Sequence, residues 1–131
     1  MGIALTATGR PDEAIDRLTE ALRIFQEARQ QFWEGMTLFR LAKVHLAVGG
    51  WRQAAAHVEQ SLVILREGGG EWRTANALTV LGSALAGMGQ LVRAHACWHD
   101  ALGIYTVLNS PEAQDVRRLL GGESASSSVA V

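Results

Sequence analysis

Three stretches of this chain repeat one pattern at a fixed spacing of 40 residues. They are residues 7–25 (ATGRPDEAIDRLTEALRIF), 47–65 (AVGGWRQAAAHVEQSLVIL) and 87–105 (GMGQLVRAHACWHDALGIY). Glycine recurs at positions 9, 49 and 89, and alanine recurs at positions 14, 54 and 94. A period of this length is typical of stacked supersecondary units, each of which buries its apolar face against its neighbours. The sequence therefore predicts a stack of such units.

Each unit has the pattern of two helices. In residues 34–50 the apolar positions 38, 41, 44, 46 and 48 follow a helical stripe more closely than the alternation of a strand. The glycines at 49–50 and 68–70 are typical of helix ends, and Pro11 is typical of a helix start. The sequence predicts seven helices, at about 2–8, 11–29, 32–48, 51–67, 71–88, 91–108 and 111–120.

The helices group into one domain over residues 1–121. It consists of a partial repeat (1–30), two full repeats (31–70 and 71–110) and a C-terminal capping helix (111–120). Residues 122–131 are small and polar, with little to bury, and are predicted to form a flexible tail. Small residues recur at positions 14, 54 and 94 and at 21, 61 and 101, where the second helices of the units are expected to cross their partners closely.

Composition excludes several classes of function. The chain has 131 residues, a net charge of −1 and a pI of about 6.4, so it has no strong field to attract nucleic acid or an anionic membrane. Its single cysteine, Cys97, cannot form an intrachain disulfide, which fits a reducing cytoplasm. The N-terminus lacks the pattern of a signal peptide. Eleven arginines against one lysine indicate a GC-rich genome, such as that of an actinobacterium.

The repeats resemble the tetratricopeptide repeat. That family places a Leu-Gly or Leu-Ala pair in the first helix, here Leu41-Ala42 and Leu81-Gly82, then a turn glycine, and then small residues at two positions of the second helix. The resemblance implies an all-α fold of antiparallel helix pairs, stacked as a short right-handed α-solenoid. The period of 40 is longer than the standard 34 and is similar to a long variant; a HEAT-like array, with a period near 40–47, is the alternative fold.

A narrower resemblance lies in EALRIFQEARQ, in residues 60–94 and in ALGIYTVLNSPEAQDVRRLL. These segments resemble the C-terminal repeat region of the antibiotic-regulatory-protein family of actinobacterial transcription regulators. The resemblance implies a sensor or protein-docking module. The phosphate-binding machinery of such regulators has no counterpart here, because the glycine-rich REGGGEWR segment lacks the lysine of that loop and the strand before it. No cofactor is expected.

In the tetratricopeptide family the first helices line a concave groove that holds a partner. Carrying the groove positions of the family over to this sequence gives eight expected partner-binding residues: Ile3, Thr6, Met36, Phe39, Lys43, Asn76, Thr79 and Ser83. With only Lys43 and Asn76 available to hold a carboxylate, a clamp for a C-terminal carboxylate is disfavoured. A helix or an apolar peptide is the expected occupant.

One segment, RAHACWHD (93–100), has the residue types of a metal site. His95 and His99 are four residues apart on one helix face, a spacing that can bind a metal. Two surface histidines are the favoured interpretation, because a structural site needs four ligands. Cys97 lies between Ala96 and Trp98, which favours ordinary packing over catalysis. The chain is therefore not expected to be an enzyme.

The sequence contains four tryptophans, which are expected to differ in exposure. Trp98 and Trp72 are expected to pack. Trp33 and Trp51 lie near helix starts and are expected to be partly exposed, either as a hydrophobic clasp at the helix entry or in contact with a partner.

Two hypotheses for function remain. The first is a protein-binding module that forms the sensor or docking end of a cytoplasmic transcription regulator and makes no direct contact with nucleic acid or membrane. The second is self-association through the N-terminal edge, where the first repeat is incomplete, with no separate ligand. A metal protein that uses His95 and His99 is a remote third.

Overall fold

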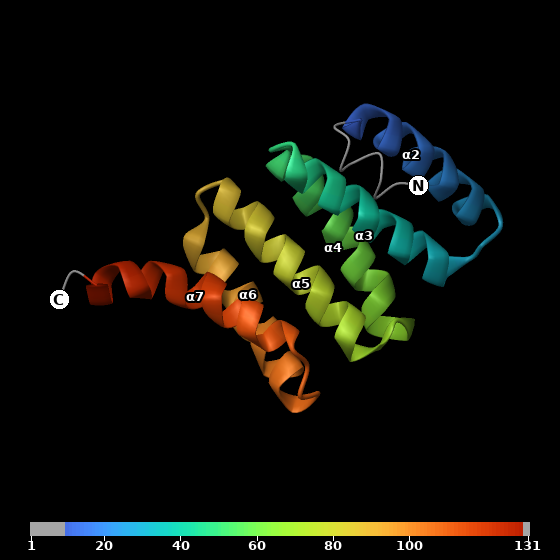
Figure 1. The fold of residues 1–131 in the computed structure, drawn as a ribbon. Helices are drawn as coiled ribbons and strands as arrows, with labels where there is room; N and C mark the ends of the chain where they lie inside the picture. Colours follow the sequence, from blue (N-terminus) through green and yellow to red (C-terminus); the bar gives the residue numbers. More distant parts are fainter. Residues whose placement is uncertain (1–9, 130–131) are drawn as a thin grey trace.

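The protein is all-α. The computed structural model describes the backbone of residues 10–129 and the side chains of residues 10–121 (Figure 1). The helices of this part of the chain are α2 (Pro11–Glu27), α3 (Gln31–Ala47), α4 (Trp51–Gly68), α5 (Gly70–Gly87), α6 (Leu91–Val107) and α7 (Glu112–Val129). The helix predicted at 2–8 lies outside the described residues. Among the described helices, none has the length and the apolar character that crossing a membrane requires.

The predicted helices agree with the observed ones to within one or two residues, except at the C-terminal end. There α7 continues to Val129, nine residues beyond the predicted end at 120 and into the predicted tail. The prediction of that helix end was wrong because the two glycines at 121–122 do not stop the helix. A helix-interior glycine costs only about 1 kcal/mol relative to alanine, and no proline follows. The flexibility of residues 122–131 remains a prediction.

Four helices end in the same way, on a residue with left-handed backbone. After α3 and α5 this residue is Gly49 (φ 80°) and Gly89 (φ 81°), where glycine avoids the steric penalty of a side chain. The next amide then bonds back into the last turn, for example Gly50 N–H to the His45 carbonyl at 2.7 Å. Arg29 (φ 56°) and Asn109 (φ 54°) take the same conformation after α2 and α6. Each turn reverses the chain and sets up the next antiparallel helix.

The helices form two layers. In Figure 1, α3 and α5 run side by side at the front with α4 behind them, and α7 lies in front of α6. Consecutive helices pack against each other, and α3 also contacts α5 across the repeat boundary. The Trp72 side chain, at the start of α5, reaches Glu112 at the start of α7. This arrangement is the predicted stack of helix pairs.

Small residues lie where the helices cross. Ala14, Ala54 and Ala94 are fully buried. A side-chain carbon added at Gly82 of α5 would lie 2.4 Å from the indole nitrogen of Trp98 on α6, so this crossing requires glycine. The Ser61 hydroxyl of α4 donates to the Gly35 carbonyl of α3 at 2.8 Å inside the core. Ser61 therefore lies at a close crossing, as predicted, and the burial of the three alanines agrees with that prediction; Ala21 is only half-buried.

Candidate functional site: the shared face of α3 and α5

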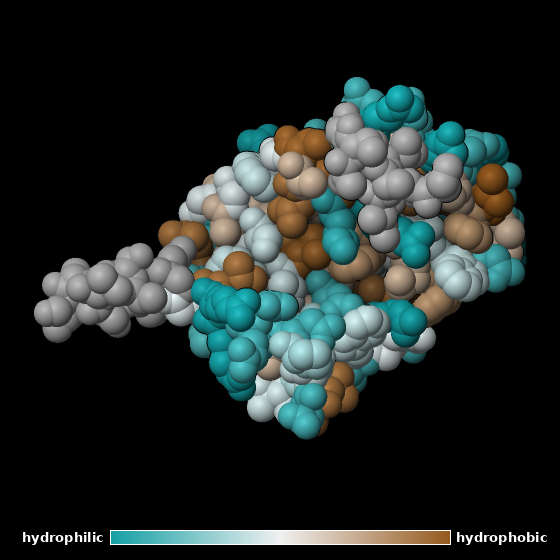
Figure 2. Space-filling view, in the orientation of Figure 1, coloured by the Kyte–Doolittle hydropathy of each residue, from teal (hydrophilic) through white to brown (hydrophobic). Residues whose placement is uncertain are grey.

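The front layer of helices presents the face on which the groove was predicted. Ile3 and Thr6 lie outside the described residues. Met36, Phe39 and Lys43 follow one stripe of α3 at steps of three and four residues. Asn76, Thr79 and Ser83 follow the corresponding stripe of α5, 40 residues later. Figure 2, drawn from the same side, shows apolar surface in the region between α3 and α5.

The α3 stripe combines an apolar base with one charge. Met36 and Phe39 are half-buried and pack against the core, so only part of each side chain is open to a partner. Lys43 is exposed, and its ammonium nitrogen lies 5.6 Å from the centre of the Phe39 ring. A cation held over an aromatic ring keeps its charge available while its aliphatic stem covers apolar surface.

The α5 stripe is polar and partly engaged within the protein. The Asn76 side-chain oxygen accepts a hydrogen bond from the hydroxyl of the buried Tyr105, which leaves the NH₂ group of Asn76 as a donor. The Thr79 hydroxyl donates to the Ala75 carbonyl at 2.9 Å. Ser83 is half-buried one turn further on. The two stripes together offer apolar contact from α3, one cation, and amide and hydroxyl groups from α5.

The structure gives little support to a metal site at the histidine pair on α6. His95 is half-buried, with its ring 5.7 Å from that of Trp98, whereas His99 is exposed. Among the residues that the structure describes, no group of three or more histidine, cysteine or acidic side chains is placed to hold a metal ion. The pair therefore stays a hypothesis without a third ligand from this part of the chain.

Cys97 is poorly placed to act as a nucleophile. Its side chain is half-buried on α6, and burial, followed by the nearby Asp100 carboxylate, raises the pKa of its thiol. A catalytic cysteine needs the opposite shift, toward the thiolate. The thiol therefore stays protonated near neutral pH and packs as a small apolar side chain.

Sequence reasoning missed a second histidine pair. His45 of α3 and His57 of α4 stack with ring centres 5.2 Å apart. Burial lowers the pKa of both imidazoles, and the pKa of His57 is lowered further by repulsion from His45. The two residues are twelve positions apart and belong to different helices, so only the antiparallel register of α3 and α4 brings them together.

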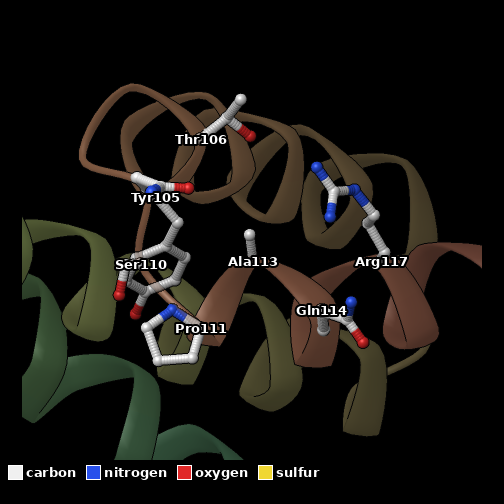
Figure 3. A pocket seen from close by; sticks show the side chains of 8 residues that line it. Tyr105, Thr106, Ser110, Pro111, Ala113, Gln114 and Arg117 are labelled. Atoms are coloured by element: carbon white, nitrogen blue, oxygen red, sulfur yellow. The ribbon is translucent and has the colours of Figure 1, made fainter.

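The structure also contains an open hollow of about 300 Å³ where α6 turns into α7. Figure 3 shows this turn and the side chains that line the hollow, among them the Arg117 guanidinium of α7. The lining residues are Tyr105, Thr106, Asn109, Ser110, Pro111, Ala113, Gln114 and Arg117. None of the predicted groove residues lines it.

Comparisons with known proteins agree with the geometry. A family model described as tetratricopeptide repeat matches residues 1–67. The chain is similar to regulatory protein AfsR of Streptomyces griseus, with 58% identity over 119 residues that cover 91% of this chain and 12% of that protein. It is also similar to regulatory protein AfsR of Streptomyces coelicolor, with 48% identity over 67 residues that cover 51% of this chain and 7% of that protein.

The chain spans only a small part of the length of these curated relatives. The family match, in contrast, covers half of the chain and coincides with the helix pairs, the glycine turns and the small crossing residues of the structure. The chain belongs to the tetratricopeptide repeat family.

Proposed function

We propose that this chain is a protein-binding module, and that the concave face of α3 and α5 holds a segment of a partner protein. The observation that carries the proposal is the composition of that face. Its side chains are half-buried or exposed, apolar on α3 and polar on α5, with Lys43 as an open cation and the Asn76 amide as an open donor. Aromatic residues and methionine are enriched at binding surfaces, and Phe39 and Met36 are the anchors.

The chemistry of the face selects the partner. Only one of the groove residues, Lys43, carries a charge, so the face is a poor clamp for a terminal carboxylate. An amphipathic helix or a short apolar segment with one acidic residue near Lys43 matches it better. The role of the chain is binding, and it uses no cofactor.

The similarity to AfsR supports the proposal that this module is part of a larger protein. We infer that it is the sensor or docking part of a larger bacterial transcription regulator that acts in the cytoplasm. The net charge of −1 over 131 residues favours contact with protein over direct contact with nucleic acid.

A pull-down with single-residue variants tests the proposal. Phe39→Ala and Lys43→Ala are expected to lose the partner that the wild-type chain retains from extracts of the source organism, with unchanged circular dichroism. Val63→Ala, on the outer side of α4, where Val63 is 65% exposed, is the matched control and keeps the partner. Equal retention of the partner by all three variants would show that the concave face does not bind it.

Self-association through the N-terminal edge is the second candidate. In the described part of this edge, α2 leaves Ile24 50% exposed. Light scattering separates the two candidates. If the chain is a dimer and Ile24→Asp makes it a monomer, self-association is supported. If the wild-type chain is a monomer at high concentration, self-association is excluded.

A further inference from the structure

Aromatic side chains and one arginine form a continuous series of contacts at the N-terminal ends of α3 and α5. The Trp33 ring stacks on Phe25, at the end of α2, with centres 6.3 Å apart, and meets the edge of Phe32 at 5.1 Å. The Arg73 guanidinium then lies 5.2 Å from the centre of the Phe32 ring and 5.9 Å from that of Trp72. We call Phe32, Trp33, Trp72 and Arg73 the aromatic rim.

The aromatic rim follows the repeat. Phe32 and Trp72 are 40 residues apart, as are Trp33 and Arg73. Phe32 lies one turn before Met36 on the same stripe of α3. The aromatic rim therefore lies where α3 and α5 begin, next to the groove residues but not among them, at the lower right of Figure 1.

The two indoles of the rim are unusually open for their size. Trp33 is 51% exposed and Trp72 is 45% exposed, whereas Trp98 in the core is 4% exposed. The expectation that Trp98 packs is confirmed, and the same expectation for Trp72 was wrong. The Trp72 indole N–H donates to the Glu112 carboxylate at 2.9 Å. The Trp33 indole N–H donates no hydrogen bond within the part of the chain that the structure describes, so it can still donate to a ligand.

Carboxylates lie beside the rim in the first turn of each front helix, and the exposed Arg29 lies in the turn before α3. Glu34, Glu71 and Glu112 occupy the first turns of α3, α5 and α7. Glu112 stays ionised, because hydrogen bonds from Ser110, from its own backbone and from Trp72 lower the pKa of its carboxyl. The one cation of the rim, Arg73, is half-buried between Phe32 and Trp72. The field at this surface therefore favours a basic ligand over an acidic one.

We propose that the aromatic rim binds an extended proline-rich segment that carries a basic residue. Proline-rich segments form a rigid polyproline II helix whose rings pack on flat aromatic surfaces, and they lose little conformational entropy on binding. The Trp33 N–H supplies a donor for a backbone carbonyl of such a segment, which has few donors of its own. The carboxylates of Glu34 and Glu71 accept the basic residue. This site is separate from the groove residues and does not depend on the proposed groove function.

Titration with synthetic peptides tests the proposal, with the indole N–H signals in NMR spectra as the readout. The main probe is decaproline with an N-terminal arginine. The matched probes are decaproline with an N-terminal glutamate and a glycine-serine peptide of equal length with an N-terminal arginine. We expect the arginine-decaproline peptide to shift the Trp33 and Trp72 signals and leave that of Trp98 in place, and the other two peptides to bind more weakly.

Variants of the rim sharpen the test. Trp33→Ala is expected to weaken binding of the arginine-decaproline peptide about tenfold or more. Trp33→Phe, which keeps a ring but loses the N–H, is expected to lie between Trp33→Ala and wild type. Trp51→Ala removes a 37% exposed tryptophan outside the rim and is expected to leave binding unchanged.

Three results would overturn the proposal. The first is no shift of either rim indole at millimolar peptide. The second is equal binding of the arginine glycine-serine peptide, which would show charge attraction alone. The third is equal or stronger binding of the glutamate peptide. Phe39→Ala and Lys43→Ala leave the rim intact, so their effect on partner capture reports on the groove separately.

Discussion

At the scale of single residues, the stack depends on a few positions that admit only one size of side chain. Gly82 is the clearest, because a side-chain carbon there would lie 2.4 Å and 2.6 Å from two atoms of the Trp98 indole. Trp98 is almost fully buried and its N–H donates to the Thr79 carbonyl at 3.2 Å, so it cannot move away without losing that bond.

Gly82→Ala is therefore expected to destabilise the protein by about 1–3 kcal/mol through overpacking. Gly103→Ala is the control, because Gly103 lies in α6 with nothing within 4 Å of an added carbon. That substitution should stabilise the helix by about 0.5–1 kcal/mol. Urea unfolding measures both, and an unchanged midpoint for Gly82→Ala would mean that the α5–α6 crossing is looser than described.

The stacked pair of His45 and His57 makes stability depend on pH. Burial lowers the pKa of both imidazoles in the folded state, and repulsion from His45 lowers that of His57 further. Above the unfolded pKa of about 6.5 both states are neutral, and the pair has no effect on pH dependence. As the pH falls below that value the unfolded chain binds protons first, so stability is lost until the pH passes below the lowered folded pKa values.

The melting temperature is therefore expected to fall between about pH 7.5 and about pH 5. The fall should be smaller in the double variant His45→Gln/His57→Gln. His99→Gln, at an exposed site on α6, should keep the wild-type fall. If the melting temperature of the double variant falls as much as that of wild type, groups other than His45 and His57 cause the pH dependence.

At the scale of the elements, the sequence predicted the helices well because each carries its own signals. The apolar stripe marks the body of a helix, and Gly49 and Gly89 mark its end. The helix ends at Arg29 and Asn109 have the same left-handed geometry without a glycine, so no glycine marks them in the sequence. The far end of α7 could not be predicted, because neither glycine nor serine is a strict stop for a helix.

The α3–α4 pair also shows how two elements are held in register. The Ser61 hydroxyl donates to the Gly35 carbonyl at 2.8 Å, and an added carbon at Gly35 would lie 2.8 Å from the Ile64 side chain. Close helix approach therefore lets a small polar side chain reach the backbone of the facing helix.

Ser61→Ala is expected to cost about 1 kcal/mol, the usual net value of one hydrogen bond. Ser83→Ala, at a half-buried site on α5, should change stability by less than about 0.5 kcal/mol. Thermal unfolding monitored by circular dichroism compares the two. A Ser61→Ala midpoint no lower than that of Ser83→Ala would contradict the role of this bond.

At the scale of the whole molecule, the repeat predicts which helices share a layer but not which contacts that layer makes. The predicted groove positions Met36, Phe39 and Lys43 were carried over from the tetratricopeptide family, and the structure shows only that they share one stripe of α3. Contacts between repeats, such as that of Arg73 with Phe32, could not be predicted, because they depend on how far one unit is rotated against the next.

The front layer, and not the outer side, is proposed to receive a partner. Site-specific photocrosslinking in the source organism tests this most directly, with the crosslinking residue at Thr79 of α5 or at Val63 of α4. We expect a discrete crosslinked protein from position 79, absent from position 63 and lost when Phe39→Ala is added. The same product from position 63, or its persistence with Phe39→Ala, would show that the front layer is not the binding surface.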